Sequence, residues 1–222
     1  MNQTLWEEVD AYLADTLLPR DDALTGALAA SAAAGLPAIQ VSPPQGRLLE
    51  MLARAIGARR ILEIGTLGGY STLWLARGIT SGGKLITIEY DPKHADVARA
   101  NFARAGRSSA IDLRVGAALE LLPQLEREHA GPFNLIFVDA DKVNLPDYFT
   151  WSVRLSRPGS LIVIDNVIRE GEVVNAESAD AAVQGVRRMN ERIAKEPRVS
   201  ATAIQTVGGK GYDGLAFVLV DR

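Results

Sequence analysis

From residue 60 onward, short apolar runs alternate with stretches of helical periodicity, and this rhythm leaves few folds open to the chain. Strands that alternate with helices form parallel sheets, and strands covered by helices on both faces are apolar throughout. We therefore predict an α/β protein with a doubly wound sheet. The seven expected strands read RRILEIG, KLITIEYD, IDLRVG, FNLIFVDAD, SLIVIDN, SATAIQTV and LAFVLV.

The last two expected strands are joined by a short segment, GGKGYDG at residues 208–214. Parallel neighbours need a crossover of a dozen or more residues, so these two strands are expected to run antiparallel. The prediction is a seven-stranded sheet that is mostly parallel and has an antiparallel last strand. Tyr212, within this connection, could contact an aromatic ligand or pack in the turn.

Three further helices are expected ahead of this core. An Ala-rich segment at 23–35 favours helix, and Pro43 and Pro44 suit the start of another. Within residues 3–18, apolar residues recur at intervals of four: Leu5, Val9, Leu13 and Leu17. We expect one domain over residues 1–222, in which residues 1–40 form a helical segment that covers the cleft or joins a second subunit and 41–222 form the catalytic core.

Composition excludes several classes of function. The chain of 222 residues has a net charge of −3, which gives no reason to expect nucleic acid or an anionic membrane as a partner. It contains no cysteine, so disulfides, zinc–thiolate sites and thiol nucleophiles are excluded. The first residues do not resemble a signal peptide and no apolar run approaches a membrane span, so we expect a cytoplasmic protein.

Acidic residues end four of the first five expected strands: Glu63, Glu89, Asp139 and Asp165. The carboxyl ends of parallel strands lie along one edge of a sheet, where ligands bind. A single acid could simply mark the point at which the chain leaves the core. Four of them predict a common cleft.

The first two acids indicate a cofactor site. The segment after Glu63 contains Gly65, Gly68 and Gly69, which allow a ligand to approach the backbone closely. Its spacing differs from the dinucleotide fingerprint G-x-G-x-x-G. Glu89 follows Gly65 by 24 residues, near the distance at which an acid binds ribose hydroxyls. These features favour an adenosine-containing cofactor without a strong phosphate cradle.

The other two acids indicate a metal site. Asp139, Asp165 and the adjacent Asn166 offer oxygen ligands, which suit a hard divalent cation such as Mg²⁺, with Mn²⁺ or Ca²⁺ as alternatives. The two histidines, His94 and His129, fall away from the strand ends, and we expect both at the surface.

Lys142 follows Asp139 by three residues. It could be an ordinary solvated loop lysine. It could also act as a general base, because a lysine held beside a divalent cation gives up its proton more readily.

Taken together, the motifs LEIGTLGGYS, LITIEYDP, FVDADK and VIDNV, in this order, resemble those of the cation-dependent class I O-methyltransferases. That family includes catechol and caffeoyl-CoA O-methyltransferases and many bacterial relatives. The resemblance covers the chain from about Val41 to the final strand. It implies a Rossmann-like fold, S-adenosylmethionine as the cofactor and a divalent cation, with Mg²⁺ the first choice.

The resemblance also assigns roles to individual residues. It implies metal ligands at Asp139, Asp165 and Asn166, and a catalytic base at Lys142. It further implies cofactor contacts with the methionine part, the ribose, the adenine and the loop before the third helix: Val41, Glu63, Gly65, Thr66, Ser71, Glu89, Ala118 and Asp139.

The implied reaction is methylation of one hydroxyl of a catechol-like small aromatic molecule, with Lys142 taking the proton. Relatives are often homodimers. Two departures leave the acceptor open: Arg169 stands where relatives have an aromatic residue after the Asp-Asn pair, and Asp141 stands where catechol O-methyltransferase has a tryptophan. The loop 167–180 could form part of a lid, in which Arg169 meets an acidic substrate group or is solvated.

Three alternatives remain open from the sequence. The acceptor could be a hydroxylated base in tRNA, bound by a basic patch that includes Arg104, Arg107 and Arg114. An NAD-dependent dehydrogenase would share the sheet and the ribose acid but leaves Asp139, Asp165 and Asn166 unexplained. A non-catalytic cofactor-binding module would not need the complete set of candidate site residues.

Overall fold

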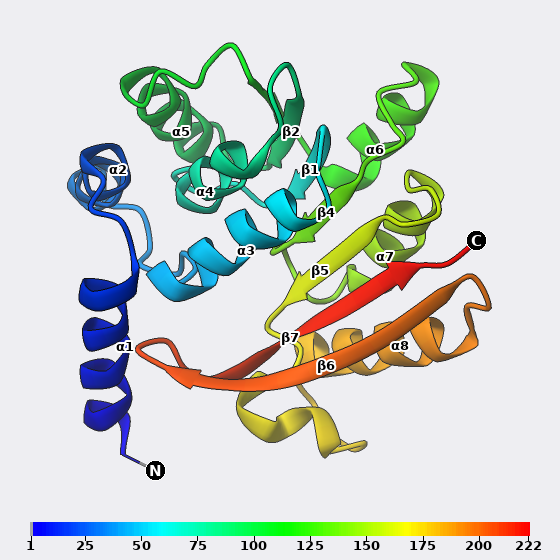
Figure 1. Ribbon diagram of the computed structural model, residues 1–222. Coiled ribbons are helices and arrows are strands. Elements are labelled where there is room, and N and C mark those ends of the chain that lie inside the picture. The colour runs from blue at the N-terminus through cyan, green and yellow to red at the C-terminus, as the bar shows by residue number, and fades with distance from the viewer. Residues whose placement is uncertain (1) are drawn as a thin grey trace.

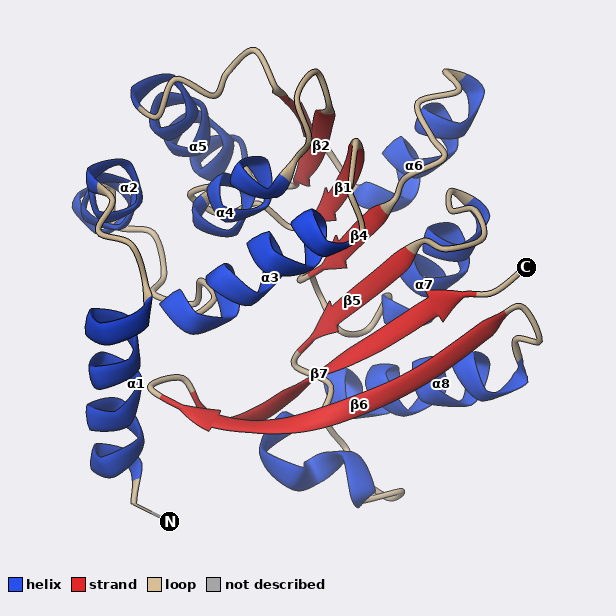
Figure 2. Cartoon of the chain, viewed as in Figure 1, coloured by secondary structure: helices blue, strands red, loops and turns tan. Residues whose placement is uncertain are grey.

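The computed structural model describes residues 2–222 and shows one seven-stranded sheet between two layers of helices (Figures 1 and 2). The strand order is β3-β2-β1-β4-β5-β7-β6, and β7 runs antiparallel to both of its neighbours. The predicted doubly wound sheet with an antiparallel last strand is therefore confirmed. The strands are β1 (Arg60–Ile64), β2 (Lys84–Glu89), β3 (Ile111–Val115), β4 (Leu135–Val138), β5 (Leu161–Asp165), β6 (Val199–Gly208) and β7 (Gly211–Val220).

The helices divide between the two faces of the sheet. One apolar core lies under α2, α3, α4 and α5, and the other lies under α6, α7 and α8, behind the sheet in Figure 1. The helices are α1 (Gln3–Leu17), α2 (Asp22–Ala33), α3 (Pro43–Ala55), α4 (Tyr70–Gly78), α5 (Pro92–Arg104), α6 (Ala118–Arg127), α7 (Leu145–Arg154) and α8 (Ala181–Lys195), with a 3₁₀ helix η1 (Arg169–Val174).

Strand β4 shows why the central strands are apolar at every position. Side chains of a strand alternate between the two faces of a sheet. Ile136 and Val138 pack in the core under α6–α8, whereas Leu135 and Phe137 pack in the core under α2–α5. With both faces covered, no position in the middle of this strand is left to water.

The hairpin β6–β7 is longer than the sequence indicated. Both strands extend into the segment 208–214, and the turn between them consists of Gly209 and Lys210. Tyr212 therefore lies in β7 opposite Val207, where its hydroxyl bonds the side chain of Gln205, and the expectation that it packs in the turn is wrong. The sequence misled because residues 208–214, which form the ends of both strands and the turn, are mostly glycine and charged residues instead of apolar ones.

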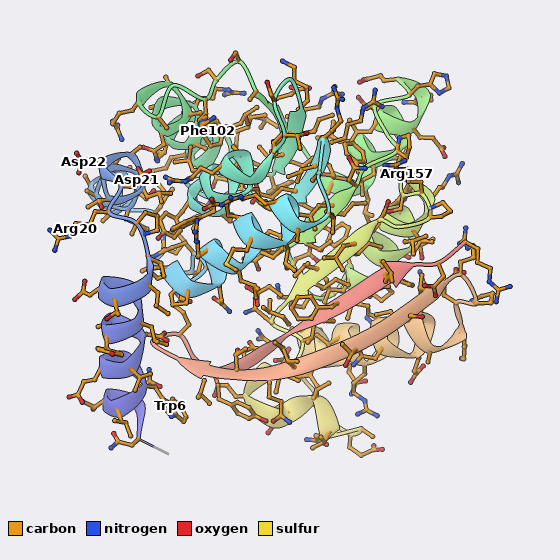
Figure 3. The ribbon with its side chains drawn as sticks, viewed as in Figure 1. Trp6, Arg20, Asp21, Asp22, Phe102 and Arg157 are labelled. Atoms are coloured by element: carbon orange, nitrogen blue, oxygen red, sulfur yellow. The ribbon has the colours of Figure 1, made fainter. Side chains whose placement is uncertain are left out.

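The two N-terminal helices are attached differently. Asp21, labelled in Figure 3, caps α2 by accepting from two backbone amides and also pairs with Arg77 of α4, which ties α2 to the core. Helix α1 instead lies beside the β6–β7 turn, held by hydrogen bonds from Gln3 to the Gly208 carbonyl and from the Gly209 amide to Asp10. In the described residues, no helix is both long enough and apolar enough to cross a membrane.

Two helical glycines give opposite predictions for substitution by alanine. A Cβ at Gly185 of α8 would lie 1.9 Å from the backbone carbonyl oxygen of Lys142, which has little room to move. A Cβ at Gly26 of α2 would meet only the flexible Arg104 side chain, at 3.7 Å. We predict that Gly185→Ala destabilises the protein by about 1–3 kcal/mol, as overpacking does. Gly26→Ala is expected to stabilise it by up to about 1 kcal/mol.

Urea unfolding of both variants checks this prediction. Equal free energies of unfolding for Gly185→Ala and the wild type would show that α8 and the segment after β4 do not pack as closely as described.

Candidate active site

The site is set by the register of four parallel strands. Ile64 of β1 pairs with Ile88 of β2 and with Val138 of β4, and Val138 pairs in turn with Ile164 of β5. The residues that follow these four form the next row along the edge of the sheet: Glu89, Gly65, Asp139 and Asp165. The strand order reverses between β1 and β4, so this row lies at the topological switch point, where α/β folds bind ligands.

Asp139 and Asp165 are direct neighbours in this row because β4 and β5 pair with each other. Adjacent strands of a sheet lie about 4.8 Å apart. Asp165 is 4% exposed. Burial, and then the negative charge of Asp139, raise the pKa of Asp165 to about 7. Its Oδ1 accepts a hydrogen bond from the backbone amide of Asn166 at 2.7 Å, and Asn166 has a left-handed φ of 58°. The structure therefore places the three predicted metal ligands at one end of β4 and β5.

Lys142 is brought to the same place by the segment after β4. The residue is 9% exposed, and its Nζ donates to Asp139 Oδ1 at 3.1 Å, which excludes the alternative of a solvated loop lysine. Asp141 fastens this segment: it accepts hydrogen bonds from the hydroxyl of Tyr148 and from the backbone amide of Asn144.

The glycine loop after β1 packs tightly against its neighbours. Gly65 has a φ of 98°, and a Cβ there would lie 2.0 Å from the carbonyl oxygen of Asp139. Gly69 has a φ of 81°, and a Cβ there would lie 2.4 Å from the ring of Phe102, which is labelled in Figure 3. Any larger residue would push the loop out of place, so these glycines bring backbone to the switch point.

Glu89 organises the same loop. Its Oε2 accepts hydrogen bonds from the backbone amides of Thr66 at 3.1 Å and Leu67 at 2.7 Å, and its Oε1 accepts from the amide of Asp91 at 2.9 Å. An ionised carboxylate has about four acceptor positions, so one remains for a ligand hydroxyl.

The two histidines differ from each other. His129 is exposed, as expected. His94 is not a plain surface residue, because its Nδ1 lies 3.5 Å from Glu89 Oε1. The sequence did not indicate this contact, since His94 lies inside α5 and comes near Glu89 only when α5 packs on the sheet.

Glu63 does not join the row of acids, and the expectation that all four converge is wrong in this respect. It lies two residues earlier in β1, opposite Thr87, and it is fully buried. Its carboxylate accepts hydrogen bonds from Ser71 Oγ and Thr87 Oγ1, both at 2.7 Å, and from the hydroxyl of Thr72. Glu63 thus ties the start of α4 to the sheet, and burial raises its pKa to about 7.

The remaining predicted cofactor residues surround the row. Thr66 is buried, with its hydroxyl bonded to that of Thr87. Ala118 is the first residue of α6, and Val41 directly precedes the Ser42 cap of α3. Both are at least nine-tenths buried.

Two cavities adjoin the β6–β7 turn, and one of them includes two of the metal-ligand candidates. The first, of about 330 Å³, is lined by α1, residues 40–43 and Tyr70. The second, of about 220 Å³, contains Asp165 and Asn166 in its wall and is closed by α3 and the β6–β7 hairpin. Lys210 lines both cavities. It could not be predicted as a site residue, because the turn that carries it is far along the chain from the motifs.

The loop after Asn166 is held in place by β7. The backbone amides of Ile168 and Arg169 both donate to Asp213 Oδ1 at 3.0 Å, and η1 follows. Arg169 is half-buried, and its Nε is buried without a hydrogen-bond partner among residues 2–222, so the expectation of a solvated side chain is wrong.

Comparison with known proteins identifies the family. The family model described as O-methyltransferase matches residues 21–218. The chain belongs to the O-methyltransferase family. This membership confirms the resemblance found in the sequence and replaces the dehydrogenase alternative.

Individual relatives of this O-methyltransferase are similar over almost their whole length. A catechol O-methyltransferase from Niastella koreensis is 53% identical over 220 residues, which are 99% of this chain and 100% of that protein. The crystal structure of an O-methyltransferase from Bacillus cereus in complex with SAH has a TM-score of 0.98 and 55% identity, covering 99% of this chain and 100% of that one. TomG from Streptomyces achromogenes, an O-methyltransferase solved in complex with SAM, has a TM-score of 0.96 and 48% identity, with full coverage of both chains.

The buried Glu63 predicts a pH-dependent stability of this O-methyltransferase. Its pKa is about 7 in the folded state and near 4.5 in an exposed carboxyl group. Between these values the folded state holds a proton that the unfolded state has released, so Glu63 lowers the free energy of unfolding as pH rises. Glu63→Gln removes this contribution. We expect its stability relative to the wild type to increase from pH 5 to pH 8 by an amount on the order of 1–3 kcal/mol.

Urea unfolding across this pH range measures the effect. Asp165 also has a raised pKa, but its contribution to the pH dependence cancels in the difference because the wild type and Glu63→Gln both contain it. Exposed Glu191→Gln on α8 is the control and should follow the wild type. Parallel curves for Glu63→Gln and the wild type would contradict the assignment of a raised pKa to Glu63.

Proposed function

We propose that the protein transfers a methyl group from S-adenosylmethionine to one hydroxyl of a catechol-like small aromatic molecule, with the help of a divalent cation. The observation that carries the proposal is the meeting of Asp139, Asp165 and Lys142 beside the glycine loop. Relatives named catechol O-methyltransferase and the complex of the Bacillus cereus protein with SAH support the choice of acceptor and cofactor.

The cofactor site proposed here is the edge of the sheet between Glu89 and Asp139. Gly65 lies between them in the row, and the absence of a side chain there leaves the loop backbone beside the Asp139 carbonyl. Glu89 would accept one ribose hydroxyl with its remaining acceptor position, while the bound cofactor supplies the methyl group. The full proposed set is Val41, Glu63, Gly65, Thr66, Ser71, Glu89, Ala118 and Asp139.

The donor set of the proposed cation site fits a hard ion. The proposed ligands are two carboxylates at the ends of neighbouring strands and the amide of the residue after Asp165, and oxygen ligands of this kind suit Mg²⁺, Mn²⁺ or Ca²⁺. Burial, and then the charge of Asp139 next to it, raise the pKa of Asp165, and a cation would offset the repulsion between the two carboxylates. Within residues 2–222 no three or more His, Cys, Asp or Glu side chains are placed for a metal, and the proposed set has two carboxylates together with the amide of Asn166. When bound, the cation would lower the pKa of the acceptor hydroxyl and disfavour the protonated form of a nearby amine.

Lys142 is the proposed catalytic base, which takes the proton from the acceptor hydroxyl at Nζ. Its hydrogen bond to Asp139 directs Nζ toward the row of acids, and its burial keeps water away from the proton transfer. The second cavity, beside Asp165 and Asn166, is the proposed place of the aromatic ring.

The remaining expectations concern partners and location. Arg114 pairs with Asp112 and Glu128, so part of the basic patch imagined for tRNA is neutralised and a small-molecule acceptor is favoured. We also propose a homodimer formed through α1, whose apolar residues Leu5 and Leu17 are 50% and 68% exposed. A cytoplasmic location remains part of the proposal.

Replacement of Lys142 tests the base. Lys142→Ala should lower kcat with catechol by about 10²–10⁴-fold, because general-base catalysis contributes this much. Calorimetric titration with S-adenosylhomocysteine should show nearly unchanged cofactor binding. Lys195→Ala, an exposed lysine on α8, is the control. Unchanged turnover in Lys142→Ala would remove Lys142 from the mechanism.

Removal of the divalent cation tests the proposed metal site. EDTA should abolish methyl transfer, and Mg²⁺ should restore it. Asp165→Asn should raise the Mg²⁺ concentration for half-maximal activity by at least about tenfold, since even residues behind metal ligands have effects of this size. The exposed Asp96→Asn on α5 serves as the matched variant and should keep the wild-type Mg²⁺ dependence. Full activity in EDTA would reject the cation site.

A further inference from the structure

The turn of the β6–β7 hairpin carries one positively charged side chain, Lys210, beside the proposed acceptor site. Lys210 lines both cavities, and it is the only basic residue in the described wall of either. The negative charges of Asp139 and Asp165 act on its ammonium group, which indicates that Nζ lies near the proposed cation site. No motif in the sequence assigns a role to this lysine.

Lys210 retains hydrogen-bonding capacity that the fold does not use. An ammonium group has three donors. One of them bonds the carbonyl oxygen of Ala38 at 2.6 Å, and within residues 2–222 the structure shows no other hydrogen bond or ion pair of this group. Lys210 is an exposed residue. Partial desolvation of its ammonium group lowers its pKa, and no anionic side chain is in contact with it to offset this.

The acids that line the same cavities are already engaged. Asp10 Oδ2 accepts from the Gly209 amide at 2.8 Å. Asp213 Oδ1 accepts from three backbone amides, those of Ile168, Arg169 and Gly214. Asp165 belongs to the proposed cation site. Glu7 accepts a hydrogen bond from the Gln3 side chain. Ionised acids can only accept hydrogen bonds, so Lys210 is the charged group in the described walls that can donate to an anionic ligand.

The rest of the second cavity suits a flat apolar body. Its apolar walls come from the loop before α3, from α3 itself and from the hairpin strands: Ile39, Val41, Leu48, Ile204, Val207 and Leu215. An aromatic ring with its hydroxyls at Asp165 and Asn166 would fill this space, and a substituent elsewhere on the ring could reach the hairpin turn.

We propose that Lys210 is a specificity-determining residue that binds a carboxylate on the aromatic acceptor, so that the preferred acceptors are catechols bearing an acidic group. This inference rests on the function proposed above and specifies the substrate class of the same site. A charge-assisted hydrogen bond from Nζ to the carboxylate would be roughly twice as strong as a hydrogen bond between neutral groups.

A purely structural role is the competing explanation, because the bond to Ala38 links the hairpin to the loop before α3. The hairpin turn is also held by the bonds from Gln3 to Gly208 and from Gly209 to Asp10, so loss of Lys210 leaves two attachments. A structural role would affect all acceptors equally, whereas charge recognition would affect only the acidic ones.

The test compares two acceptors that share the catechol ring, 3,4-dihydroxybenzoate and the neutral 3,4-dihydroxybenzaldehyde, in the full-length enzyme with Mg²⁺. Lys210→Met should raise KM for the acid by about tenfold or more, with a smaller change in kcat, because a hydrogen bond to a charged group is lost. The aldehyde should lose far less. Lys210→Arg, which keeps the charge, should retain most of the preference for the acid, and exposed Lys195→Met should match the wild type.

The activities on the two acceptors, together with calorimetric measurements of acceptor binding, distinguish failure of this inference from failure of the proposed function. Equal losses on both acceptors, or no loss on the acid, overturn the role of Lys210 while the methyltransferase proposal stands. If the wild type methylates neither compound, the proposed acceptor class fails, and calorimetric titration of both compounds into protein loaded with S-adenosylhomocysteine and Mg²⁺ decides about Lys210. Weaker binding of the acid alone in Lys210→Met supports the inference, and any other result overturns it.

Discussion

The register between β1, β2, β4 and β5 is the constraint on which the rest of the site depends. Because Ile88, Ile64, Val138 and Ile164 pair side by side, the next residue of each strand falls in one row: Glu89, Gly65, Asp139 and Asp165. A slip of one residue in any pair would turn the functional side chain to the other face of the sheet. The apolar cores on both faces hold this register, so the packing of the interior determines where the chemistry can occur.

Buried charge is handled in two different ways in this protein. Glu63 receives hydrogen bonds from the hydroxyls of Ser71, Thr72 and Thr87, so its polar atoms are satisfied within the fold. Asp165 has one backbone amide and a second carboxylate, Asp139, as its neighbour. Burying like charges side by side is unfavourable unless a ligand offsets them, and such local conflicts are typical of functional sites. The polar atoms of Glu63 are thus satisfied within the fold, whereas the pairing of Asp165 with Asp139 calls for a positively charged ligand.

Features that follow from local pattern could be predicted from the sequence, and features that follow from pairing could not. The alternation of apolar runs and helices gave the sheet, its direction and the helices that cover it. The ends of the apolar runs correctly located three of the four acids, Glu89, Asp139 and Asp165, at the edge of the sheet. Glu63 lies two residues before that edge, opposite Thr87, and no local pattern shows this pairing. His94 and Lys210 were missed for the same reason, since each reaches the site only through the packing of α5 or of the β6–β7 hairpin.

The two halves of the site are built from parts of different rigidity. The proposed cofactor half consists of strand ends and a glycine loop that neighbouring backbone and Phe102 hold in place, so a change there disturbs the core. The proposed acceptor half is closed by the hairpin turn and the loop before α3, which are joined by single polar contacts such as the one from Lys210 to Ala38. Substitutions in the second half can alter which ring is accepted without moving Asp139 or Lys142. Recognition of the acceptor can therefore change independently of methyl transfer, and the differences between relatives in acceptor choice are expected to lie at positions such as 39, 204 and 210.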